Sequence, residues 1–114
     1  MPRFVILEHD HPELHWDLML EAGEVLRTWR LSRPPETSGA TIDALAIGDH
    51  RKAYLDDEGP VSGGRGSVKR WDAGKYELMG PSDDLRLVFS GQRLHGKARL
   101  QLGHANSWGF TWAG

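Results

Sequence analysis

Three side chains near the start of the chain, His9, His15 and Asp17, are of the types that bind a metal ion through nitrogen and oxygen. Two imidazoles and one carboxylate form the facial ligand set that suits manganese, iron(II) or zinc and leaves positions open for water and substrate. Such a centre can bind a phosphate oxygen and activate water. These residues therefore indicate metal-assisted hydrolytic chemistry.

The segment Leu14–Glu21 alternates, with apolar residues at its even positions and His15 and Asp17 among its odd positions. Because side chains along a β-strand point to opposite faces in turn, His15 and Asp17 are predicted to project together. An ordinary strand with one face on the core gives the same alternation, so this pattern alone leaves a purely structural role open. His9 ends the preceding apolar run before a turn that contains Pro12, and antiparallel pairing of the two runs would bring it beside His15.

His11 is a competing ligand, because His9 and His11 put two imidazoles two residues apart, as cupin-like metal sites do. Pro12 argues against a regular strand at this point, and we interpret His11 as an exposed turn residue. A cupin-like small-molecule enzyme that uses His9, His11 and His15 ranks last among the hypotheses, since the later motifs do not support it.

The composition predicts one small intracellular domain. The 114 residues are predicted to form a single domain over 1–114, and no cysteine is present, which fits a reducing cytoplasm and a metal held by nitrogen and oxygen. No long apolar span is visible, so we expect a cytoplasmic protein without membrane association. The net charge of −2 differs from the strongly positive charge of a protein that binds duplex nucleic acid through many phosphates, so any contact with nucleic acid should be local. We expect a monomer.

Short strand-like runs separated by turn signals fill the sequence, and none shows a long helical period. The runs are Arg3–Glu8, Leu14–Glu21, Glu24–Leu31, Ile42–Ile47, Arg51–Leu55, Ser67–Trp71, Lys75–Met79, Leu85–Phe89, Ala98–Leu102 and Trp108–Trp112. Turn signals include Glu21-Ala22-Gly23-Glu24 and Asp72-Ala73-Gly74-Lys75. We predict an all-β fold, a small closed or nearly closed β-barrel of short, mainly antiparallel strands, because closure removes exposed edges. Residues 33–40, rich in Pro, Ser and Thr, are predicted to form a mobile surface loop.

Several motifs occur in the order of a known family. They are Phe4-Val5-Ile6-x-x-His9-Asp10, Leu14-His15-Trp16-Asp17-Leu18-x-Leu20-Glu21, Leu26-Arg27-Thr28-Trp29, Ala44-Leu45-Ala46-Ile47-Gly48-Asp49-His50 with Tyr54 after it, Asp57-Glu58-Gly59, and Gly64–Tyr76. Together they resemble the 3′-phosphoesterase domain of bacterial DNA ligase D over nearly the whole chain. The histidine signature is fairly specific, whereas the glycine-rich part alone would be weak.

Members of that family are β-barrels that use manganese to trim DNA 3′ ends, removing a terminal ribonucleoside and then the 3′-phosphate. The resemblance implies that the two histidines and the aspartate named first bind a divalent metal, with manganese expected and zinc or another first-row ion as alternatives. It also implies that His50 and Tyr54 contact phosphate in the same cavity, and Arg33 falls where the family places a basic residue. Without the resemblance, His50 is typical of a strand-end turn and Tyr54 of a packed barrel residue.

The chain departs from the family pattern at Met19, where the family has an arginine that can clamp a phosphate. A thioether cannot neutralise a phosphate, and losing one such contact typically slows a reaction by about 10²–10³-fold. Four arginines could replace it, namely Arg33, Arg51, Arg65 and Arg70, and Arg33 is our first choice. The acidic residue that usually stands two positions before the family histidine is Gly48 here.

The leading hypothesis is a divalent-metal-dependent 3′-phosphoesterase that acts on a DNA 3′ end or another phosphoester, with His50 contacting the phosphate or assisting proton movement. The alternative is a catalytically degenerate module that keeps the barrel and metal site and binds a phosphate or DNA end, which Met19 motivates. The polymerase and ligase modules of the multidomain enzyme are absent from the sequence. We therefore expect a stand-alone member that works beside separate ligase or polymerase repair proteins.

Overall fold

The computed structural model describes residues 1–37, 40–56 and 58–114. Short strands with one buried face account for most of this chain, as the alternating apolar runs predict. The elements are β1 (Arg3–His9), β2 (His15–Ala22), β3 (Val25–Leu31), β4 (Ile42–Arg51), the 3-10 helix η1 (Lys52–Leu55), β5 (Gly59–Pro60), β6 (Ser67–Met79), β7 (Asp84–Gly91), β8 (His95–His104) and β9 (Ser107–Trp112). Among the described residues, no helix is long and apolar enough to cross a membrane.

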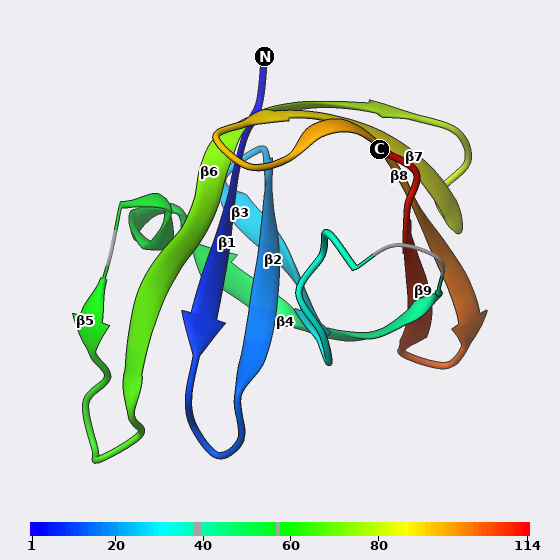
Figure 1. Ribbon diagram of the computed structural model, residues 1–114. Coiled ribbons are helices and arrows are strands. Elements are labelled where there is room, and N and C mark those ends of the chain that lie inside the picture. The colour runs from blue at the N-terminus through cyan, green and yellow to red at the C-terminus, as the bar shows by residue number, and fades with distance from the viewer. Residues whose placement is uncertain (38–39, 57) are drawn as a thin grey trace.

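Eight of these strands close into an antiparallel barrel (Figure 1). The order around it is β1-β2-β3-β4-β9-β8-β7-β6, and the pairing of β6 with β1 closes the ring. The short strand β5 pairs with the first residues of β6 and extends the sheet beyond the barrel. The predicted all-β class and closed barrel are confirmed, and closure leaves the barrel strands without a free edge.

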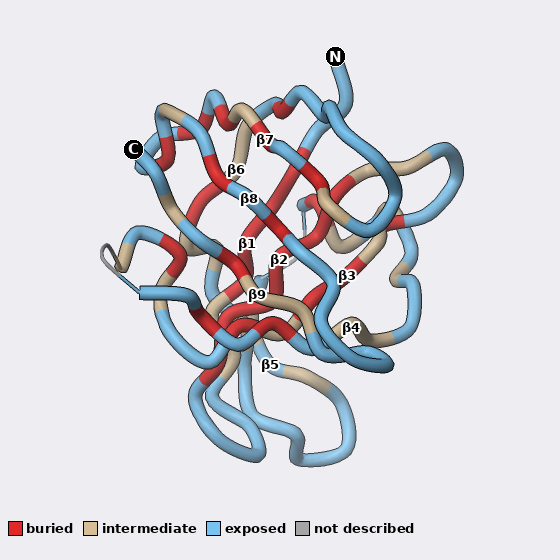
Figure 2. Tube along the Cα trace, turned by 90° about the vertical axis from the view of Figure 1, so that its right-hand side faces the viewer, coloured by how far each residue is buried: buried red, intermediate tan, exposed pale blue. Residues whose placement is uncertain are grey.

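The inner core of the barrel is apolar and receives side chains from all eight barrel strands. Alternate positions of each strand point inward, so the even positions of β2 that are apolar in sequence, Trp16, Leu18 and Leu20, belong to this core. On β9, Phe110 is fully buried while Trp108 and Trp112 pack against the same core, as their alternation predicts. Figure 2 shows buried and exposed positions alternating along β8.

A second apolar cluster lies on the outer face of β1, β2 and β3. This outer cluster consists of Val5, Leu7, Met19, Leu26 and Leu55, each at most 4% exposed. Leu55 is contributed by η1, which lies over β1 and covers part of that face. The first strands of the chain are therefore buried on both faces, whereas a one-layer barrel wall normally has one wet face.

Three predicted strands differ in the structure. The run Arg51–Leu55 is not a strand, because Arg51 ends β4 and the remaining residues form η1. A four-residue helical turn lets Leu55 reach the outer cluster. Ser67–Trp71 and Lys75–Met79 are not separate strands either, since both belong to the continuous strand β6.

The turn predicted at Asp72-Ala73-Gly74-Lys75 lies inside β6 and is not a turn. Asp72 is only 3% exposed, and its carboxylate accepts backbone N–H bonds from Gln92, Arg93 and Leu94 at 2.8, 3.1 and 2.9 Å. The aspartate thus holds the loop between β7 and β8, and the irregularity in the sequence is a register shift of β6 against β1.

Gly74 has a packing role at this point of β6. A β-carbon there would collide with the backbone carbonyl oxygen of Ser90 on β7, so only glycine allows this approach of the two strands. The surface loop predicted over residues 33–40 connects β3 to β4, and its residues 38–39 lie outside the described residues, as does Asp57 of the glycine-rich motif.

Candidate metal centre

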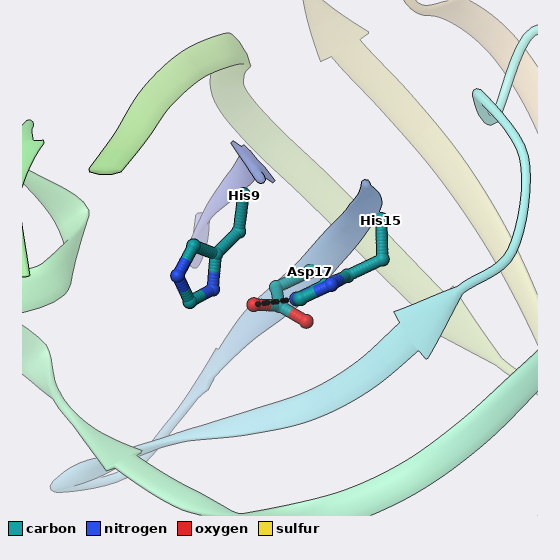
Figure 3. Close-up of side chains that lie close together, drawn as sticks. All are labelled: His9, His15 and Asp17. Atoms are coloured by element: carbon teal, nitrogen blue, oxygen red, sulfur yellow. Dashed lines mark hydrogen bonds and ion pairs between the residues drawn. The ribbon is translucent and has the colours of Figure 1, made fainter. Parts of the chain in front are cut away.

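His9 and His15 face each other across the first hairpin of the barrel. His9 ends β1, His15 begins β2, and the two are register partners in the antiparallel pair. Asp17 shares the outer face of β2 with His15, as the alternation predicts. One ligand atom from each of the three side chains lies within 4.8 Å of the others, and Figure 3 shows both imidazoles converging on the carboxylate.

The orientation of His15 is fixed by the turn that precedes it. Its Nδ1 lies 2.8 Å from the backbone carbonyl oxygen of Glu13, and because a carbonyl only accepts, Nδ1 donates. In the neutral ring, Nε2 then carries a lone pair, yet it lies 3.2 Å from Oδ2 of Asp17. Two electron pairs that face each other at this distance require a cation, either a proton on the imidazole or a metal ion.

His9 is oriented in the same way by a different segment. Its Nε2 donates to the backbone carbonyl oxygen of Arg65 at 2.8 Å, so Nδ1 is the nitrogen left to act as a ligand. Arg65 lies in the hairpin between β5 and β6, and Asp10 holds the same hairpin by accepting the backbone N–H of Ser67 at 2.8 Å. That bond lowers the pKa of Asp10, and the neighbouring imidazoles of His9 and His11 lower it further.

The burial and the orphaned atoms of this cluster fit a divalent cation. His15 and Asp17 are each 5% exposed. Among the described residues, Asp17 Oδ1 has no hydrogen-bond partner, and the guanidinium Nε of Arg30 lies 3.7 Å from it. A buried carboxylate oxygen without a partner is costly unless a cation binds it. Two imidazoles whose second nitrogens are anchored on carbonyls, together with one carboxylate, form a donor set for a first-row metal.

Two of the three side chains, His9 and Asp17, line a cleft of about 200 Å³, here called the metal cleft, whereas His15 lines a neighbouring cleft. Its walls come from β1, β2, β3, β4, η1, the β5–β6 hairpin and β6, through Leu7, His9, Asp17, Met19, Arg30, Ile47, His50, Tyr54, Val61, Arg65 and Val68. His50 and Tyr54, both predicted from the sequence, are thus brought to the same cleft as His9 and Asp17. Their rings meet edge to face with centroids 5.3 Å apart.

A hydrogen-bond chain selects the tautomer of the neutral His50 ring. The hydroxyl of Thr28 donates to the backbone carbonyl of Leu26 at 3.1 Å, which uses its single proton. The Nδ1 of His50, 3.0 Å from that hydroxyl, must therefore donate to it. The neutral imidazole of His50 consequently has an unprotonated Nε2, which can accept a proton or a hydrogen bond.

Comparison with known proteins identifies the family. Residues 7–102 match the family model for the DNA ligase D 3′-phosphoesterase domain. The chain belongs to this family. It is 30% identical over 122 residues to the multifunctional non-homologous end joining protein LigD of Mycolicibacterium smegmatis, covering 93% of this chain and 16% of that protein.

Two further relatives agree with this assignment. The LigD protein of Pseudomonas aeruginosa is 30% identical over 111 residues, covering 86% of this chain and 13% of the relative. The multifunctional non-homologous end joining DNA repair protein LigD of Mycobacterium tuberculosis is 29% identical over 114 residues, covering 92% of this chain and 15% of the relative. The chain therefore corresponds to a small part of each of these proteins.

Met19, which stands at the arginine position of the phosphoesterase family pattern, is 2% exposed in the outer cluster and lines the metal cleft. Arg33, the first candidate to replace that arginine, is exposed beyond the end of β3 and does not line the metal cleft. Arg51 is also exposed at the end of β4 and does not line this cleft. The guanidinium of Arg70 donates to the backbone carbonyl of Leu55 at 3.4 Å and lies away from the metal cleft.

Arg30 lies in the metal cleft and is absent from the sequence-based predictions. The sequence contained a signal for it. The turn at Gly23 and Glu24 pairs Ala22 with Val25, and counting back along both strands of this hairpin puts Arg30 directly opposite Asp17.

Proposed function

We propose that the protein is a divalent-metal-dependent phosphoesterase that acts on DNA 3′ ends in repair, removing a 3′-phosphate or a 3′-ribonucleoside. The observation that carries this proposal is the group of two imidazoles and a carboxylate whose ligand atoms lie within 4.8 Å of one another, beside a cleft that also contains His50 and Tyr54. The family to which the chain belongs is described as the 3′-phosphoesterase domain of DNA ligase D, and the relatives are named for non-homologous end joining. Manganese is the metal we propose, and separate ligase or polymerase proteins would complete the repair.

His9, His15 and Asp17 would hold the ion, each imidazole fixed by a main-chain carbonyl. When bound, the ion supplies Lewis acidity that polarises a phosphoryl oxygen and makes a water molecule more acidic. Hydrolysis of a 3′-phosphate joins the water oxygen to phosphorus and breaks the bond between phosphorus and O3′. His50 takes the proton that the water loses on its free Nε2 and returns it to O3′, while the hydroxyl of Tyr54 donates to a phosphoryl oxygen.

A second function is favoured by Met19, which puts a neutral side chain where the family has a cation. In this alternative the protein keeps the barrel and metal site and binds a phosphate or a DNA 3′ end without cleaving it. Binding of a 3′-phosphorylated oligonucleotide by well-folded, metal-loaded protein, with no product released, would favour this alternative over the enzyme.

The test is release of phosphate or of a ribonucleoside from DNA primers blocked at the 3′ end, in the presence of manganese. We expect release by the native protein and loss of release in His15→Ala, because the ligand set is then incomplete. Metal content is measured on both proteins by elemental analysis, which separates loss of the ion from loss of another function.

His104→Ala is the matched control, since His104 is an exposed histidine at the end of β8. We expect this variant to bind metal and release product as the native protein does. Release that is equal in native protein and His15→Ala, or that continues after chelation of the metal, would contradict the proposal.

A further inference from the structure

We infer that Arg30 binds the phosphate of the substrate and that the cleft on its far side takes the attached nucleoside. The inference rests on the proposed function, because it assigns residues to the substrate of the same site. Arg30 lines both the metal cleft and a second cleft of about 330 Å³. The second cleft is lined by Pro12, Glu13, Leu14, His15, Arg30, Ser32, Asp43 and Leu45.

The strand register places Arg30 beside the candidate ligands. One row of outward-pointing residues crosses the sheet from Leu7 to Asp17, Arg30 and Leu45, each the register partner of the next. Side chains directly opposite each other in an antiparallel pair are close enough to interact. The strand register therefore makes Arg30 and Asp17 neighbours. Arg30 lies on a strand and not on a loop, and a strand holds a side chain in a more precise position for binding a ligand.

The guanidinium of Arg30 has donor capacity to spare. Its Nε is buried and has no hydrogen-bond partner among the described residues, and the 3.7 Å to Asp17 Oδ1 exceeds a hydrogen bond. The side chain as a whole is 39% exposed, so the remaining surface is open to a ligand. An anion that supplies acceptor oxygens can bind at the exposed part of this side chain, and planar guanidinium groups match phosphate oxygens in pairs.

The other candidates in the metal cleft are neutral or already bonded. Met19 has no charge. The guanidinium of Arg65 donates to the carbonyl and the hydroxyl of Ser62 at 2.8 and 3.3 Å, within its own hairpin. Of the two arginines that line the metal cleft, Arg30 is therefore the one whose Nε has no hydrogen-bond partner among the described residues.

The second cleft differs in chemistry from the metal cleft. Leu14 and Leu45 are 54% and 46% exposed, which gives it apolar walls. Glu13 and Asp43 also line it, and two carboxylates disfavour a second phosphate there. Apolar walls with a few polar groups suit a sugar and base, which is the part of a DNA 3′ end joined to the phosphate that Arg30 would hold.

The test compares binding of two ligands to manganese-loaded protein by calorimetry, namely inorganic phosphate and an oligonucleotide that ends in a 3′-methylenephosphonate, an analogue of the 3′-phosphate that cannot be hydrolysed. Arg30→Met should weaken both at least about tenfold and lower the salt dependence of oligonucleotide binding by about one phosphate contact. Arg30→Lys keeps the charge without the paired geometry and should restore part of the affinity. Leu45→Ser should weaken the oligonucleotide and leave inorganic phosphate unchanged.

Arg86→Met is the matched control, because Arg86 is an exposed arginine on β7, in the other half of the barrel. Circular dichroism and the metal affinity of each variant show whether it is folded and loaded. If Arg30→Met binds both ligands as tightly as the native protein does, the role of Arg30 is overturned. It is also overturned if this variant loses as much affinity for the metal as it loses for phosphate. Equal losses of both ligands in Leu45→Ser would overturn the nucleoside cleft. Because binding is measured without turnover, a protein that binds and does not cleave contradicts the proposed function alone.

Discussion

The two halves of the barrel treat their outer faces differently. On β7 and β8, buried residues alternate with exposed ones, and Arg86, Lys97 and Arg99 point from the outer face toward solvent. On β2, every residue from His15 to Leu20 is buried, because η1, the outer cluster and the β5–β6 hairpin cover the outer face.

The difference in outer-face burial coincides with the position of the candidate site. An exposed wall can carry charge at little cost because water solvates it. A covered wall that carries His15 and Asp17 has removed them from water, and its polar atoms are only partly satisfied by the protein. The strands β7 and β8 have one buried and one exposed face. The strand β2 is buried on both faces, and polar atoms on its outer face lack hydrogen-bond partners among the described residues.

The largest expected effect is on activity, from Asp17→Ala. We expect metal uptake and phosphate release to be abolished, because the carboxylate ligand is gone. The free energy of unfolding of metal-free protein should fall by no more than about 3–5 kcal/mol, the cost of breaking a buried pair, since Oδ2 of Asp17 lies 3.2 Å from Nε2 of His15. Metal titration, the primer assay and urea denaturation measure the three quantities.

Asp84→Ala in the other half is the control for that comparison. Asp84 is held by Arg99 through bonds of 2.7 and 2.8 Å on the outer face of β7 and β8. We expect its removal to leave metal uptake and turnover unchanged. If turnover survives in Asp17→Ala, or disappears equally in both variants, the proposal that only the half containing β2 carries the site is contradicted.

The next effect in size is on stability, from Leu18→Ala in the inner core. Leu18 is fully buried, and a Leu→Ala change at such a site costs about 2–5 kcal/mol. Leu55→Ala in the outer cluster should fall near the lower end of that range, because η1 is a single turn at the surface that can settle into the space. Urea denaturation compares the two, and a larger loss for Leu55→Ala would show that the covering layer is the main source of stability.

The smallest expected effect is on stability at low pH. The guanidinium of Arg99 lowers the pKa of the Asp84 carboxyl, so this contact adds stability above the pKa of the unfolded chain and loses it as pH falls through the folded pKa. Thermal melts of native protein and Asp84→Asn should therefore converge below the normal aspartate range. A difference between the two proteins that grows on acidification would contradict this assignment.

Local periodicity was enough to predict the central part of the site. The alternation of β2 fixes the directions of His15 and Asp17, and a two-strand hairpin then brings His9 alongside. The all-β barrel follows from the same periodicity with many turns. The roles of His50 and Tyr54 came from the family motifs alone, and the structure brings both residues to the metal cleft while their roles stay predictions.

What could not be predicted depends on contacts between distant segments. Arg51–Leu55 reads as a strand from its residues, but the packing of Leu55 on β1 decides for a helical turn. Asp72 reads as a turn residue, but it serves a loop twenty residues further along. The choice of Arg33 followed position along the chain, whereas Arg30 reaches the cleft through cross-strand register.

The orientation of both candidate ligand histidines by main-chain carbonyls has a consequence for how this family can diversify. A carbonyl is the same whatever side chain its residue carries, so Glu13 and Arg65 can be exchanged without turning the imidazoles that bond to them. An insertion or deletion in either loop would move the carbonyl and turn the ring. We therefore expect the metal centre to tolerate substitutions at Glu13 and Arg65 better than changes in the length of these two loops.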